Sequence, residues 1–135
     1  MTETKAPPPP GVWPTLRASD ARGLIKFLTE ALGFEATVVY ADGDTVHHAE
    51  LAWPPGGGVM LGSARPDDPH SVTRPGGFSA YVVTSDPDAL HARAVAHGAK
   101  VTMEPYDTDY GSRDFAITDP EGNHWSFGTY PGAPR

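Results

Sequence analysis

His48 and Glu50 are the residues of this chain whose types and spacing best suit chemistry. They lie in the segment 46–53, which has the pattern of a strand, where successive side chains point to opposite faces. With Ala49 and Leu51 facing the core, His48 and Glu50 share the other face. A histidine beside a carboxylate can transfer protons near neutral pH, and the same pair can equally orient a bound molecule. Both residues are therefore candidates for catalysis and for ligand binding.

His124 is a third possible donor, and with His48 and Glu50 it would form a His₂Glu set able to bind a divalent metal. The chain has no histidine pair at helical i, i+4 spacing and no compact cluster of ligands. We therefore favour the interpretation that these residues are hydrogen-bonding groups in a polar pocket wall. The chain has no cysteine and no sequence context of a Ser-His-Asp triad, which leaves no evident nucleophile.

The composition limits the classes of protein and partner. A chain of 135 residues that is 39% hydrophobic and 20% charged fits one compact domain. Its net charge of −7 argues against nucleic acid and anionic membrane as partners, because both attract basic surfaces. No apolar run approaches the roughly 20 residues that span a bilayer. Residues 1–11 lack the apolar core of a signal peptide, so we expect a cytoplasmic protein.

The chain repeats part of itself 66 residues apart, which indicates two related modules. The matching residues lie where an element should begin or end. They are Ser19-Asp20 and Ser85-Asp86, Tyr40 and Tyr106, and Gly62 and Gly128.

Each half has the pattern of a strand, a helix and three further strands. Both helices begin at Ser-Asp, two good N-cap residues, and both end at a glycine, Gly33 or Gly98. We expect residues 12–62 to form a first βαβββ module and residues 78–130 a second, joined by a linker over 63–77. Residues 1–11, with four consecutive prolines, and residues 131–135 are expected to be tails, the first of them disordered.

The sharpest local motif is Asp119-Pro120-Glu121-Gly122-Asn123, which has the residues of a type I turn between two strands. Paired βαβββ modules with this phrase before the last strand resemble the vicinal oxygen chelate superfamily. That superfamily includes glyoxalase I, the bleomycin and fosfomycin resistance proteins and the extradiol dioxygenases. Supporting phrases are Leu16-Arg17-Ala18-Ser19-Asp20, Leu32-Gly33-Phe34, His48-Ala49-Glu50-Leu51 and Val59-Met60-Leu61-Gly62.

The resemblance implies an α+β fold in which two modules form an open, cup-shaped mixed sheet with a helix on each outer face. Metalloenzymes of the superfamily place His, Gln or Glu ligands on the first and last strand of each module. Those positions correspond here to Trp13, Met60 or Gly62, Phe78 and Ser126. None of these is a strong ligand for a divalent metal. We therefore expect no metal cofactor at that location.

An apolar cup of this kind suits a planar or greasy molecule held by a few polar groups. We expect metal-independent binding of a small, largely apolar or aromatic molecule, as in drug-sequestering relatives, with Trp13 and Phe78 stacking on it. Tyr106 and Tyr110, on the segment 105–111, would close over the cavity. The full set of expected ligand-binding residues is Trp13, Thr15, His48, Glu50, Met60, Phe78, Tyr106, Tyr110, His124 and Ser126.

Other residues receive simpler interpretations. Alternation assigns Tyr81 to the packing between sheet and helix, and Arg113 with Asp114 is explained by a surface ion pair better than by charge at the cup mouth. The resemblance also implies a homodimer, formed side by side or by exchange of modules through the linker. The alternative function is a glyoxalase- or dioxygenase-type enzyme that uses His48, Glu50 and His124 with a relocated metal or as acid–base groups.

Overall fold

The computed structural model describes residues 8–69 and 73–134. The first part of the proline-rich tail, the middle of the linker and Arg135 lie outside these residues. Neither helix in the described part of the chain is long and apolar enough to cross a membrane.

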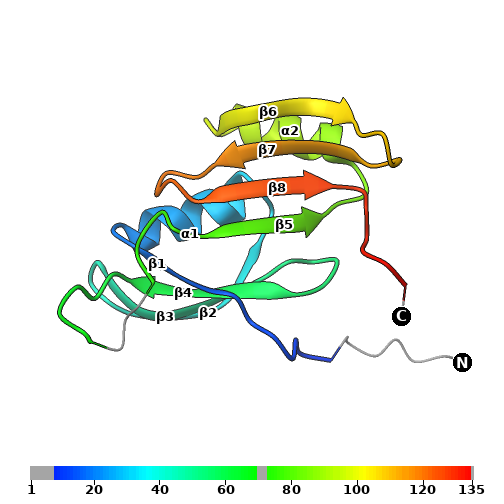
Figure 1. The fold of residues 1–135 in the computed structure, drawn as a ribbon. Coiled ribbons are helices and arrows are strands. Elements are labelled where there is room, and N and C mark those ends of the chain that lie inside the picture. The colour runs from blue at the N-terminus through cyan, green and yellow to red at the C-terminus, as the bar shows by residue number, and fades with distance from the viewer. Residues whose placement is uncertain (1–7, 70–72, 135) are drawn as a thin grey trace, which may run out of the picture.

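Two βαβββ modules make up the fold, so the expected α+β class is confirmed (Figure 1). The first sheet has the order β1-β4-β3-β2 and the second the order β5-β8-β7-β6; in each, the two strands named first are parallel and the other pairs antiparallel. The elements of the first module are β1 (Thr15–Ala18), α1 (Ala21–Glu30), β2 (Glu35–Asp42), β3 (Thr45–Ala52) and β4 (Gly58–Ser63). Those of the second are β5 (Ser79–Val83), α2 (Pro87–Ala96), β6 (Lys100–Asp107), β7 (Arg113–Thr118) and β8 (His124–Gly128).

The same capping chemistry begins both helices. The Asp20 carboxylate accepts a hydrogen bond from the Gly23 amide, and the Asp86 carboxylate accepts one from the Ala89 amide. These bonds satisfy amides that have no partner inside the helix. The repeat in the sequence is therefore a repeat of helix starts.

Helix α1 lies between the two sheets (Figure 1). The Arg93 guanidinium of α2 donates hydrogen bonds to the carbonyls of Glu30 and Thr29 at the end of α1. Phe34, which follows α1, packs edge-on against Trp125 of β8 at 5.6 Å between ring centroids. The helix-bearing sides of the modules thus face each other within the chain.

The Asp-Pro-Glu-Gly-Asn motif forms the expected turn and also joins the modules. The Gly122 amide donates to the Asp119 carbonyl, which closes the turn. The Glu121 carboxylate accepts hydrogen bonds from the amides of Ser19 and Asp20 at the start of α1. A carboxylate is stabilised there because the amino end of a helix is electropositive.

The first part of the segment 105–111, which was expected to close over a cavity, is strand. β6 continues through Asp107 because it pairs with β7, with Tyr106 opposite Asp114. The remaining turn is tied by hydrogen bonds between Thr108 and Ser112 in both directions.

Candidate ligand-binding faces

Each sheet has one side packed on a helix and one side without a helix. We call the uncovered side of the β1-β4-β3-β2 sheet the first face and that of the β5-β8-β7-β6 sheet the second face. On β3, Ala49 and Leu51 are fully buried, so His48 and Glu50 lie on the first face as expected. On β8, Trp125 and Phe127 are fully buried, so His124 and Ser126 lie on the second face.

Strand register places the residues of the first face in rows. Thr15 of β1 lies opposite Met60 of β4, which lies opposite Glu50 of β3. His48 Nε2 lies 2.8 Å from Glu50 Oε2, and the ring of Tyr40 stacks on the His48 ring. The structure therefore brings four of the expected ligand-binding residues together on this face.

A hollow of about 90 Å³ lies beside this row, and its lining includes Thr15, Arg17, His48, Met60 and Gly62. A Cβ at Gly62 would come within 2.7 Å of the Arg17 guanidinium. Glycine at this position leaves the space that the cation occupies.

The second face has a corresponding row of Tyr81 of β5, Ser126 of β8 and Ala116 of β7. His124 Nε2 lies 3.4 Å from the Ser126 hydroxyl. Tyr81 follows Thr15 by 66 residues, and Ser126 follows Met60 by the same interval. Thr15 with Met60 and Tyr81 with Ser126 are thus the equivalent neighbours on the first and last strands of the two modules.

These four residues do not fit a divalent metal. Zinc, iron and related ions take imidazole, carboxylate or thiolate ligands, whereas the four side chains offer two aliphatic hydroxyls, a phenol and a thioether. The alternative set of His48, Glu50 and His124 is divided between the two sheets. Within residues 8–69 and 73–134, no three His, Asp or Glu side chains are grouped closely enough to hold a metal ion.

Two aromatic residues, Phe78 just before β5 and Tyr81 within it, point to the sides opposite to those expected. Phe78 packs inward on Trp125, with 5.3 Å between ring centroids, while Tyr81 is exposed on the second face. A shift of one residue moves every side chain of a strand to the other side. The 66-residue interval between the modules could have predicted this register. It relates Trp13 to Ser79 and not to Phe78.

Trp13 precedes β1 and is half-buried. A Cβ added at Gly58 would lie 2.9 Å from the Trp13 ring, so the indole covers the start of β4. It lies at the end of the first sheet and not in the row of Thr15 and Met60.

Tyrosine side chains surround Asp114 on the second face. Asp114 accepts hydrogen bonds from the Ser112 hydroxyl at 2.5 Å and from the Tyr110 hydroxyl at 3.4 Å. Tyr81 donates its hydroxyl to the Tyr130 carbonyl at 2.8 Å. Desolvation and the negative charge of Asp114 both raise the pKa of Tyr81 and of Tyr110, with desolvation the larger cause in each.

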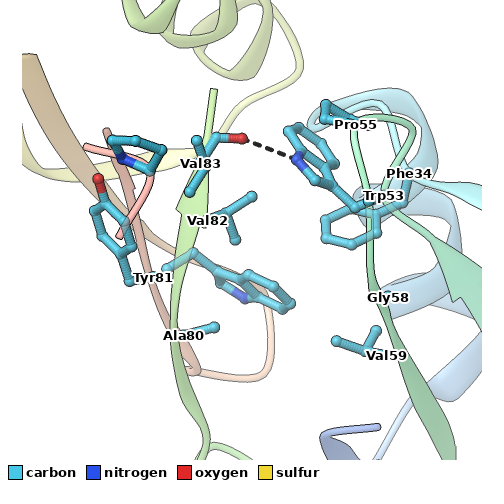
Figure 2. Close-up of a pocket in the computed structure, with 12 residues that line it drawn as sticks. Phe34, Trp53, Pro55, Gly58, Val59, Ala80, Tyr81, Val82 and Val83 are labelled. Atoms are coloured by element: carbon cyan, nitrogen blue, oxygen red, sulfur yellow. Dashed lines mark hydrogen bonds between the residues drawn. The ribbon is translucent and has the colours of Figure 1, made fainter. Parts of the chain in front are cut away.

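A separate pocket of about 400 Å³ lies between the modules (Figure 2). Phe34, Trp53 and Val59 line it from the first module, and Val82 and Trp125 from the second. The Trp53 indole donates a hydrogen bond to the Val83 carbonyl, which ties the two modules at one end of the pocket. Figure 2 shows Val82 pointing from β5 into this pocket and Tyr81 pointing away from it.

Solved structures of several related proteins share this fold. TioX from Micromonospora sp. ML1 has 28% sequence identity and a TM-score of 0.71, over 87% of this chain and 98% of that chain. TnmS3, an antibiotic binding protein from Streptomyces sp. CB03234, has 24% identity and a TM-score of 0.65, over 84% and 88% of the two chains. A glyoxalase I mutant from Zea mays has 21% identity and a TM-score of 0.67, over 89% of this chain and 45% of that chain. The curated proteins include no match to this sequence.

The profile of one protein family matches residues 12–127, which cover both modules and both faces. The match agrees with the paired βαβββ topology and with the Asp-Pro-Glu-Gly-Asn turn that joins the modules. The chain belongs to the Glyoxalase/Bleomycin resistance protein/Dioxygenase superfamily.

Proposed function

We propose that this protein binds a small, largely apolar or aromatic molecule without the help of a metal. The observation that carries the proposal is the set of Thr15, Met60, Tyr81 and Ser126 at the equivalent places of the two sheets. These side chains offer hydroxyl groups and polarisable apolar surface in place of metal ligands. Such a surface holds organic molecules by stacking and a few hydrogen bonds. His48, Glu50 and His124 add polar groups at the same faces.

We propose further that the ligand is a natural product, such as an antibiotic, and that binding sequesters it. The similarity to TnmS3, described as an antibiotic binding protein, supports this class of ligand. Cytoplasmic location is part of the same proposal.

A homodimer would complete the binding site. β1 and β5 are edge strands of their sheets, and edge strands offer unpaired backbone groups to another chain. The two faces also expose large apolar side chains without a helix to cover them, including Tyr40, Tyr81, Val83, Met103 and Tyr106. Contiguous patches of this kind mark interaction surfaces. We therefore propose that the first face of one chain meets the second face of its partner, with the ligand between them.

The experiment is a fluorescence quenching screen with planar natural products, including anthraquinones and flavonoids, followed by calorimetry with the compounds that quench. We expect Ser126→Trp to abolish binding because it fills the second face, and Ala80→Met to leave binding unchanged because Ala80 lines the pocket between the modules. Loss of binding in Ala80→Met alone would move the site to that pocket. Failure of the whole panel, together with a closed cup in a crystal structure, would refute the proposal.

A second candidate function is a glyoxalase- or dioxygenase-type enzyme, and the contact of His48 with Glu50 beside a hollow favours it. Elemental analysis of protein purified without chelators tests its metal-dependent form. A stoichiometric transition metal that disappears in His48→Ala would favour this function over simple binding.

A further inference from the structure

The second face holds a carboxylate, Asp114, for which the described residues provide no cationic partner. In the described part of the chain, the hydrogen-bond partners of Asp114 are the hydroxyls of Ser112 and Tyr110. The neighbouring Arg113 forms its ion pairs with Asp88 and Asp107 and not with Asp114, contrary to the surface ion pair suggested by the sequence. Since partly buried charges are normally compensated, Asp114 is available to an external cation.

Four tyrosines stand around this carboxylate. Tyr106 lies directly opposite Asp114 across the β6–β7 pair, and directly opposed residues project their side chains on the same side. Tyr110 approaches Asp114 with its hydroxyl and meets the Tyr130 ring edge-on, at 6.1 Å between centroids. The four tyrosines have side chains that are between 41% and 64% exposed. They are Tyr81, Tyr106, Tyr110 and Tyr130.

Gly128 allows these groups to converge. A Cβ at Gly128 would overlap Asp114 Oδ1 and come within 2.6 Å of the Tyr81 hydroxyl. The equivalent glycine of the first module, Gly62, makes room for the Arg17 guanidinium instead. The same position in the two modules thus lies beneath an anion in one and a cation in the other.

We propose that Asp114 and the surrounding tyrosines bind a protonated amine of the ligand. Aromatic rings attract an ammonium group through their negative faces, and a carboxylate at the base of the group adds a direct charge interaction. The net charge of −7 favours the approach of a cation over that of an anion. This inference rests on the proposed function and narrows its ligand to aromatic compounds that carry a basic nitrogen.

The test compares two probes of nearly equal shape, 2-naphthylmethylamine, which is protonated at pH 7, and neutral 2-naphthalenemethanol. Binding is followed by NMR shifts of the tyrosine rings in the full chain. We expect the amine to bind about fivefold more tightly than the alcohol, in line with known cation–aromatic contributions. Asp114→Asn, which retains an acceptor for Ser112 and Tyr110, should lower the ratio to about two, the part that the aromatic rings alone supply.

The matched control is Asp109→Asn, which removes the same charge from a nearby exposed residue and should preserve the preference for the amine. Tyr110→Leu should reduce the preference to about threefold without affecting the fold, because Tyr110 is 64% exposed. Equal binding of amine and alcohol, an unchanged ratio in Asp114→Asn, or no shift of the four tyrosines would overturn the inference. If the neutral alcohol still binds in those cases, the proposed function survives and only the preference for an amine is lost.

Discussion

Positions 48 and 114 are related by the repeat, yet they carry groups of different chemistry. His48 lies within hydrogen-bond distance of the Glu50 carboxylate, whereas Asp114 accepts hydrogen bonds from hydroxyl groups. The position equivalent to Glu50 in the second module is Ala116, so the Glu50 carboxylate has no counterpart beside Asp114. The two faces are therefore alike in backbone and different in charge, which suits a ligand with two dissimilar ends.

At the residue scale, we predict that Asp114→Asn lowers the pKa of Tyr81 and Tyr110. Both values are raised above the usual 10.0, and the Asp114 charge is a secondary cause after desolvation. Removing the anion makes each phenolate easier to form, so the pKa values should fall but stay above that of free tyrosine. Carbon-13 NMR titration of the tyrosine rings measures both groups. A titration identical to that of the unmodified protein would contradict the described position of Asp114.

The raised pKa values of Tyr81 and Tyr110 also determine how the stability of the protein depends on pH. Because the folded state keeps these phenol protons to higher pH than the unfolded state, the contribution of Tyr81 and Tyr110 to the free energy of unfolding is fully present below about pH 10. It is lost as the pH rises through the folded-state values.

At the scale of elements, the turn between β7 and β8 shows how a short motif positions a whole strand. The buried Asp119 carboxylate accepts hydrogen bonds from the amides of Glu121 and Asn123, from the Asn123 side chain and from the Trp125 indole. The Asn123 side chain in turn accepts from the Phe78 amide next to β5. Trp125 is thereby held inward, so its neighbours His124 and Ser126 must face outward.

We predict that Asp119→Ala destabilises the fold by about 3 kcal/mol, because it leaves several buried donors without an acceptor. Chemical denaturation followed by fluorescence gives the free energy of unfolding. Asp109→Ala, which removes an exposed carboxylate, is the control and should change stability little. A similar loss in both variants would show that the network around Asp119 is not responsible.

At the scale of the whole molecule, the helix-bearing sides of the two modules pack on each other, which directs the two uncovered faces away from each other. Glu121, Arg93 and Trp53 each make hydrogen bonds that hold this arrangement. Under the proposed function, a single chain would present two half-sites, and a dimer would join them in pairs.

This arrangement predicts complementation between Met60→Trp, which blocks the first face, and Ser126→Trp, which blocks the second. Each variant alone should form a homodimer without functional sites. Refolding the two together should restore about a quarter of the sites, since half of the dimers are mixed and each mixed dimer has one unblocked pair of faces. Calorimetry counts the sites and light scattering confirms the dimer. No recovery in a mixed dimer would show that the site lies within one chain.

Local signals in the sequence were sufficient for the elements and for much of the first face. Caps, glycine stops and turn residues act over a few positions, so they predicted both helices and the turn over 119–123. Alternation on β3, with its clear Ala49 and Leu51, placed His48 and Glu50 correctly. The short β5 offered no such contrast, because both Phe78 and Tyr81 are aromatic, and its register was settled by pairing with β8 and by the packing of Phe78 on Trp125. The group of tyrosines around Asp114 and the position of α1 between the sheets depend on contacts between residues far apart in the chain, which no local pattern records.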